Sequence, residues 1–170
     1  CLRESPSETE NLAETNFVVY FSIKEKSCKL FLRGLSMNFA ENSENFCDKA
    51  VFSPFPGGTR EGKKFFSGAV CLFDSGVGGL SVLFKCREIL PSRKFIYYGD
   101  NVRAPYGNLP PEAICGYVSE AAEELAGYFP PALVLACNTA EACCGESLRK
   151  KYPFPVLGAC PPVLAAGKNG

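Results

Sequence analysis

From about residue 69 onward, short apolar runs alternate with longer stretches in which apolar residues recur every three or four positions. Runs this short and this apolar are typical of strands that are buried on both faces, as in a parallel sheet. They lie at residues 69–73, 94–98, 133–136 and 155–158. We therefore predict a strand at each of these places.

The stretches between the runs have the pattern of amphipathic helices. One follows the glycines at 76–79, a second is opened by Pro110, Pro111 and Glu112, and a third spans about 139–151. Proline and an acidic residue in a first turn favour the start of a helix. The buried face of the second helix is predicted at Ile114, Val118, Ala121, Leu125 and Tyr128. Strands that alternate with helices predict an α/β fold with an open parallel sheet.

Residues 1–67 have a different pattern. Residues 1–16 are polar, Phe17–Phe21 has the composition of a short strand, and 53–64 is rich in proline and glycine and ends in charges. We predict that 1–67 is an extension and linker, largely unstructured, and that 68–170 forms the folded lobe.

Composition narrows the functional classes. The chain has 18 basic and 18 acidic residues, which disfavours nucleic acid as a partner. No apolar stretch approaches the roughly 20 residues that a membrane helix needs. The ten cysteines fall partly in predicted strands and helices, without a C-x-x-C pair and without any histidine. We expect reduced thiols, a cytoplasmic protein and no metal site, and the missing histidine excludes Ser-His and Cys-His pairs within the chain.

Two tripeptides follow predicted strands and carry candidate chemistry, namely Asp74-Ser75-Gly76 and Cys137-Asn138-Thr139. Ligands of open parallel sheets bind beyond the carboxyl ends of the strands, so a carboxylate and a thiol are expected to meet there. The dipole of the helix that starts at Cys137 favours its thiolate, and the donors beside it suit a substrate carboxylate. A thiolate beside an anchored carboxylate can take a proton from the adjacent carbon.

Other interpretations of these residues remain open. The glycines at 76–79 also resemble a phosphate-binding loop of a nucleotide-binding module, although Ser81 stands where the third glycine belongs. Asp100 lies where such a module carries its ribose-binding acid. Taken alone, Asp74 could be a helix cap and Cys137 a buried small residue.

Four motifs in order resemble bacterial glutamate racemases: FDSGVGGLS at 73–81, YGD at 98–100, RAPYG at 103–107 and ACNTA at 136–140. The resemblance covers about residues 70–166. It implies the amino-terminal part of an enzyme with two flavodoxin-like α/β lobes that interconverts L- and D-glutamate without a cofactor. It also implies that D-glutamate made in this way supplies peptidoglycan synthesis. The resemblance also allows a homodimer of the full-length protein.

The same resemblance implies roles for individual residues. Cys137 would be one of two catalytic cysteines, and Asp74 would both hold the substrate and tune proton transfer. The remaining residues implied to bind the substrate are Ser75, Tyr106, Gly107, Asn138 and Thr139.

The sequence departs from the family at the second cysteine. That residue belongs to a Cys-Thr-His motif, which this chain lacks, and Cys160 is followed by two prolines instead. We expect that the chain as given does not racemise glutamate alone. A related aspartate racemase, a nucleotide-binding module and a non-catalytic remnant are the alternatives.

Overall fold

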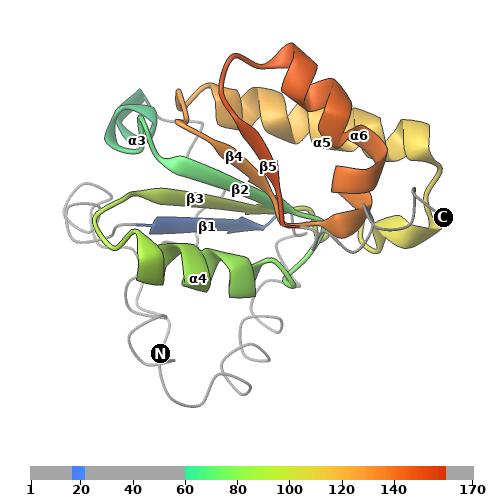
Figure 1. Cartoon of the computed structure of the whole chain (residues 1–170), viewed down its shortest axis with the longest axis horizontal. Helices are drawn as coiled ribbons and strands as arrows, with labels where there is room; N and C mark the ends of the chain where they lie inside the picture. The colour runs from blue at the N-terminus through green and yellow to red at the C-terminus, as the bar shows by residue number, and fades with distance from the viewer. Residues whose placement is uncertain (1–16, 22–59, 160–170) are drawn as a thin grey trace, which may run out of the picture.

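The described part of the chain folds around a parallel sheet of five strands. The computed structural model describes residues 17–21 and 60–159. Within them the strands lie in the order β1-β3-β2-β4-β5, and every neighbouring pair is parallel (Figure 1). Their bounds are β1 Phe17–Phe21, β2 Val70–Asp74, β3 Phe95–Gly99, β4 Leu133–Leu135 and β5 Val156–Gly158. The predicted α/β class with an open parallel sheet is confirmed.

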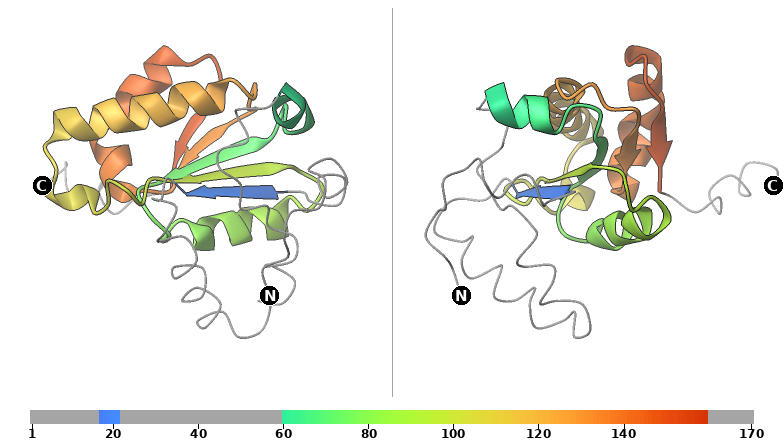
Figure 2. Two further views of the ribbon diagram at one scale, coloured as in Figure 1. Left: turned by 180° about the vertical axis from the view of Figure 1, so that it is seen from behind. Right: turned by 90° about the vertical axis from the view of Figure 1, so that its left-hand side faces the viewer.

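Helices cover both faces of this sheet. The helix α4 packs on one face, and α5 and α6 lie together on the other (Figures 1 and 2). The helical bounds are α3 Arg60–Phe65, α4 Leu80–Ile89, the 3-10 turn η2 Tyr106–Asn108, α5 Pro111–Ala126 and α6 Asn138–Lys151. A helix connects each strand from β2 onward to the next strand along the chain, namely α4 between β2 and β3, α5 between β3 and β4, and α6 between β4 and β5. Parallel strands require crossovers of this kind.

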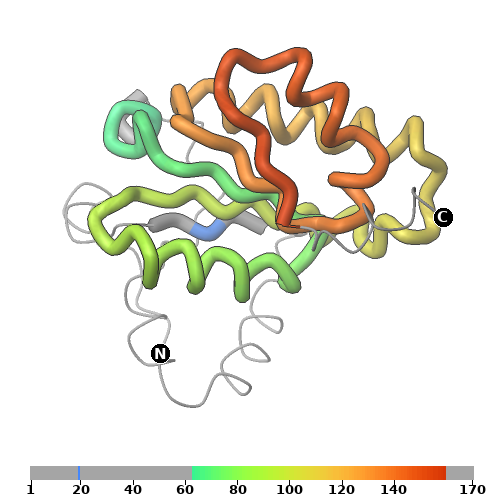
Figure 3. Tube along the Cα trace, viewed as in Figure 1, coloured from blue at the N-terminus to red at the C-terminus, as the bar shows by residue number. Residues whose placement is uncertain are grey.

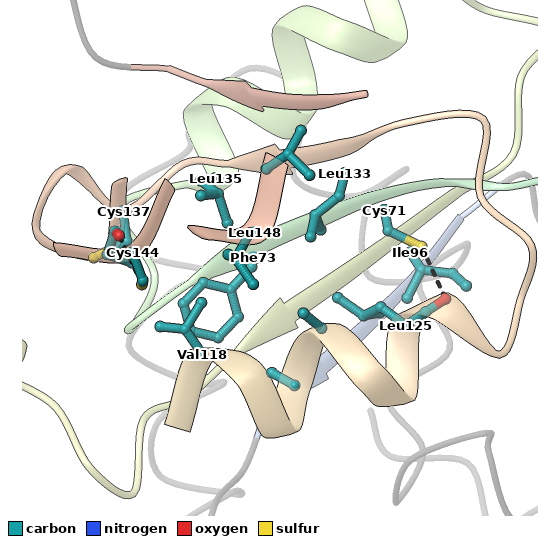
Figure 4. Packing of buried hydrophobic residues seen from close by; sticks show 14 of the residues in the cluster. Cys71, Phe73, Ile96, Val118, Leu125, Leu133, Leu135, Cys137, Cys144 and Leu148 are labelled. Atoms are coloured by element: carbon teal, nitrogen blue, oxygen red, sulfur yellow. Dashed lines mark hydrogen bonds between the residues drawn. The ribbon is translucent and has the colours of Figure 1, made fainter. Parts of the chain in front are cut away.

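Alternate side chains of the strands pack into two separate hydrophobic cores, one on each face of the sheet. Cys71 and Phe73 of β2 point toward α5 and α6 (Figure 4), whereas Leu72 packs with Leu80 and Leu83 of α4. The whole of β2 is buried, as its unbroken apolar pattern predicts. The predicted inner face of the second helix is confirmed at the buried residues Ile114, Val118, Ala121 and Leu125, whereas Tyr128 is buried just beyond the end of α5.

The sheet includes a segment from the predicted extension. The strand expected at Phe17–Phe21 is confirmed as β1, and it pairs with β3 from Phe17 opposite Phe95 to Phe21 opposite Gly99. Phe66, just before the predicted boundary of the lobe, is fully buried. The folded lobe thus draws on residues before 68. The other residues predicted as unstructured, 1–16 and 22–59, lie outside the described part of the chain, as does Cys160.

Candidate active site

The carboxyl ends of β2, β3 and β4 gather at one edge of the sheet (Figures 1 and 3). Asp74 is the last residue of β2 and is only 6% exposed. Its Oδ2 accepts hydrogen bonds from the backbone N–H groups of Gly76 at 3.2 Å and Gly79 at 3.1 Å. The carboxylate therefore holds the loop that follows its own strand in a closed turn.

Tyr97 of β3 supports this turn from the neighbouring strand. Its hydroxyl lies 2.9 Å from the carbonyl oxygen of Gly76 and 3.3 Å from Asp74 Oδ2, where it can donate to either acceptor. Burial, with the Asp74 carboxylate beside it, raises the pKa of Tyr97, so the hydroxyl stays protonated as a donor. Sequence reasoning missed Tyr97, because a tyrosine inside an apolar strand reads as core. Its position one strand away from an acidic strand end is the signal that could have found it.

Gly79 lets the loop approach the neighbouring strands closely. A Cβ atom at this position would lie 2.7 Å from the Cβ of Ala136 and 2.9 Å from that of Asp74. Contacts that short do not occur between real side chains, so the packing of the loop requires glycine here. The last glycine of the 76–79 stretch is therefore explained by packing.

Cys137 lies where β4 passes into α6, and the structure brings it to the Asp74 loop. The residue is 6% exposed, and its Sγ lies 3.4 Å from Ser75 Oγ. It is the N-cap of α6, so it lies at the positive end of the helix dipole. The meeting of the two tripeptides, predicted from the strand ends, is thus present in the structure.

Asn138 and Thr139 form the first turn of α6 beside this thiol. Asn138 is exposed and Thr139 is half-buried, so both remain within reach of solvent. The first N–H groups of a helix have no partner within the helix and can bind an anion. This end of α6 is therefore suited to a carboxylate.

Tyr106 is held by a buried acid rather than being open to the site. Its hydroxyl donates to Asp100 Oδ2 at 2.6 Å, and both residues are only 2% exposed. Burial and this hydrogen bond raise the pKa of Tyr106 above its usual range. The ring packs near Phe73, while Gly107 is exposed in the turn η2. Tyr106 thus fixes the loop in place, whereas Gly107 beside it is exposed.

Arg103 connects the same loop to α5. Its guanidinium lies 3.5 Å from Asp100 and 3.0 Å from Glu120, and it stacks over the ring of Tyr117 at 4.2 Å. In the sequence analysis, Asp100 was a candidate for the ribose-binding acid of a nucleotide-binding module. In the structure its Oδ2 accepts the hydrogen bond from Tyr106 and forms the ion pair with Arg103.

The backbone N–H groups of the glycine loop, like the Asp100 carboxylate, are bound by other groups of the protein. The N–H groups of Gly76 and Gly79 are bound to Asp74, whereas a phosphate-binding loop presents such groups to the ligand. Both features that favoured a nucleotide therefore serve internal contacts instead.

Three further facts concern the described part of the chain. It contains no group of three or more His, Cys, Asp or Glu residues that could hold a metal ion. Its six cysteines are all free thiols. No helix among the described residues is both long enough and apolar enough to span a bilayer.

These features define an α/β lobe of the open parallel-sheet class, with a buried carboxylate and a thiol at the carboxyl ends of adjacent strands. Comparison with curated proteins agrees with that class. The chain is 42% identical to glutamate racemase 2 of Bacillus subtilis over 94 residues, and this match covers 55% of this chain and 36% of that protein. It is 45% identical over 94 residues to a glutamate racemase of Geobacter metallireducens, covering 55% and 35%. No family model matches the chain.

Solved structures give the same result. A glutamate racemase from Thermus thermophilus in complex with β-chloro-D-alanine superposes with a TM-score of 0.55 at 36% identity, over 61% of this chain and 41% of that one. The Escherichia coli glutamate racemase in complex with L-glutamate and the activator UDP-MurNAc-Ala gives 0.53 at 38% identity, over 59% and 39%. The matched part of this chain is therefore related to glutamate racemases. The chain spans little more than a third of the length of the curated relatives it matches.

Proposed function

We propose that this lobe supplies one of the two proton-transferring groups of a glutamate racemase active site. The observation that carries the proposal is the contact of the Cys137 thiol with Ser75, at 3.4 Å, beside the turn held by Asp74. This contact joins the two segments that share their motifs with the racemases. Cys137 acts as the acid–base group at the α-carbon of glutamate, and no cofactor takes part.

The α-carboxylate of the substrate binds at the start of α6. Asn138, Thr139 and the N–H groups of the first turn provide its donors. Ser75 and the loop of Tyr106 and Gly107 complete this side of the substrate pocket. The substrate α-carbon then lies next to Cys137, which takes its proton as a thiolate and returns it as a thiol.

Ser75 stays bonded to Cys137 in both protonation states. A hydroxyl can accept a hydrogen bond from the thiol and can donate one to the thiolate. Asp74 supports this arrangement because its carboxylate fixes the turn that begins at Ser75. In this proposal Asp74 also tunes the proton transfer from its position beside the site.

Racemisation requires a proton-transferring group on each face of the α-carbon, and one thiol serves only one face. Inverting the α-carbon requires one base to remove a proton on one face and another acid to return it on the opposite face. By resemblance, the second thiol belongs to a Cys-Thr-His motif, and the chain contains no histidine. We therefore propose that the given chain alone does not racemise glutamate. We also propose that the whole enzyme acts in the cytoplasm and supplies D-glutamate for peptidoglycan.

The test compares the 170-residue chain with a completed protein, in which this lobe is joined to the remaining part of the Bacillus subtilis relative. We expect D-glutamate to form from L-glutamate with the completed protein and not with the chain alone. L-Aspartate serves as the second substrate, and we expect it to be turned over poorly. Robust racemisation by the chain alone, or a folded completed protein without glutamate turnover, would contradict the proposal. A preference for aspartate would favour the related aspartate racemases.

A further inference from the structure

The interface between α5 and α6 carries three thiols that the proposed reaction does not use. Cys115 lies on α5, and Cys143 and Cys144 lie on α6. The Cys115 Sγ donates a hydrogen bond to the carbonyl oxygen of Cys143 at 3.5 Å, and that of Cys144 donates to the carbonyl oxygen of Ala140 at 2.9 Å. The Cys115 thiol of α5 therefore lies against the backbone of α6 at the residue directly before Cys144. Thiols from two different helices thus meet at this interface.

The two thiols differ in their access to solvent. Cys115 is half-buried, whereas Cys144 is 1% exposed. Burial, with a smaller contribution from Cys115, raises the pKa of Cys144 to about 12. A soluble oxidant therefore reaches Cys115 first, and Cys144 lies behind it as a protected partner.

We propose that Cys115 and Cys144 are an oxidisable pair, which a hydroperoxide converts to a disulfide between α5 and α6. The sulfur of Cys115, as a thiolate, attacks the O–O bond of hydrogen peroxide, which gives a sulfenic acid on Cys115 and one water. The sulfur of Cys144 then displaces the hydroxyl group of the sulfenic acid, which leaves as a second water. In total the two thiols lose two electrons and two protons, and one peroxide is reduced to two waters.

This bond would act on the helix that carries Cys137. Cys144 is two turns along α6 from Cys137, and both belong to one buried cluster (Figure 4). A disulfide at Cys144 fastens α6 to α5, so it restricts movement of the segment that presents Cys137 and its neighbours. Cys137 itself is not consumed, and a dithiol reductant reverses the change.

The test uses the full 170-residue chain, treated with hydrogen peroxide, alkylated and cut after glutamate. Cys115 then lies in the peptide 113–120, and Cys143 and Cys144 lie in the peptide 142–146. We expect these peptides to be joined, with a mass two hydrogens below their sum, and to separate on reduction. No such joined peptide in the treated wild-type chain would overturn the proposal.

Single variants identify the partner of Cys115. The joined peptides should persist in Cys143→Ser and in the control Cys86→Ser on α4, and should vanish in Cys144→Ala and Cys144→Ser. Circular dichroism of each variant shows that it is folded. A joined pair that survives in folded Cys144→Ala, or that vanishes in Cys143→Ser, would overturn the assignment to Cys144. This result does not depend on racemase activity, so it can fail separately from the proposed function.

Discussion

At the scale of single residues, the loop after β2 depends on the missing side chain of Gly79. A Cβ there would meet Ala136 and Asp74 at distances below 3 Å. We predict that Gly79→Ala lowers the free energy of unfolding by about 1–3 kcal/mol, because strands of a packed core must shift to make room. Urea denaturation measures this change.

A matched control for that substitution lies on α5. At Gly116 a Cβ would meet nothing within 4 Å, and the residue is exposed within the helix. Gly116→Ala should therefore raise the free energy of unfolding by about 0.5–1 kcal/mol, since alanine favours a helix. Equal effects of the two substitutions would contradict the crowding described around Gly79.

The contribution of Tyr106 to the free energy of unfolding is predicted to depend on pH. Its raised pKa means that the folded state keeps the phenol proton at a pH at which the unfolded chain, with a pKa of about 10, releases it. The stability from Tyr106 is therefore full below pH ~10 and is lost as the pH rises further. We predict that Tyr106→Phe costs about 1–3 kcal/mol at pH 7, because it removes the donor to the buried Asp100.

The measurement is a series of urea denaturation curves between pH 7 and pH 11 for both proteins. The difference in unfolding free energy should stay constant up to pH ~9 and shrink above pH ~10. A difference that is constant throughout, or one that grows with pH, would contradict the buried hydrogen bond.

At the scale of elements, β5 is fastened to α6 by one arginine. Arg149 Nε donates to the carbonyl oxygen of Val156 at 3.0 Å, and its guanidinium also binds the carboxylate of Glu141. The other oxygen of that carboxylate is buried without a described partner. Losing Arg149 would therefore leave a largely buried carboxylate without its counter-charge.

We predict that Arg149→Gln lowers the free energy of unfolding by about 1–3 kcal/mol. The adjacent pair of Lys150 and Glu146 provides a control, because both of its side chains are exposed. Lys150→Gln should change stability by less than about 0.5 kcal/mol, as exposed ion pairs contribute little. If the two variants lost equal stability, the link from α6 to β5 would have no special role.

Most elements could be predicted from the sequence, because periodicity is a local signal. The inner face of α5 follows from apolar residues three and four apart, and each predicted strand is present to within two residues. The place of β1 could not be predicted in this way. A strand's partner depends on which sheet edge is open, and the pairing of β1 with β3 joins segments far apart in the chain.

At the scale of the whole molecule, parallel topology explains why the site residues meet. Asp74 and Cys137 end adjacent strands, so the sheet places them at one edge without any local sequence link. That meeting was predictable because both tripeptides follow strands of a parallel sheet, whose carboxyl ends lie on the same side. The internal contacts of Tyr97 and Tyr106 were not, because they depend on the exact packing of side chains from neighbouring strands and loops.

The measurement that tests the central claim most directly is the exchange of the α-proton of glutamate in deuterated water. It follows L-glutamate and D-glutamate separately by NMR, with the completed protein and its Cys137→Ser variant. If Cys137 serves one face of the α-carbon, the variant should lose exchange of one enantiomer by about 100-fold or more and retain exchange of the other. Exchange of both enantiomers at the unmodified rate, or an equal loss for both, would contradict the account.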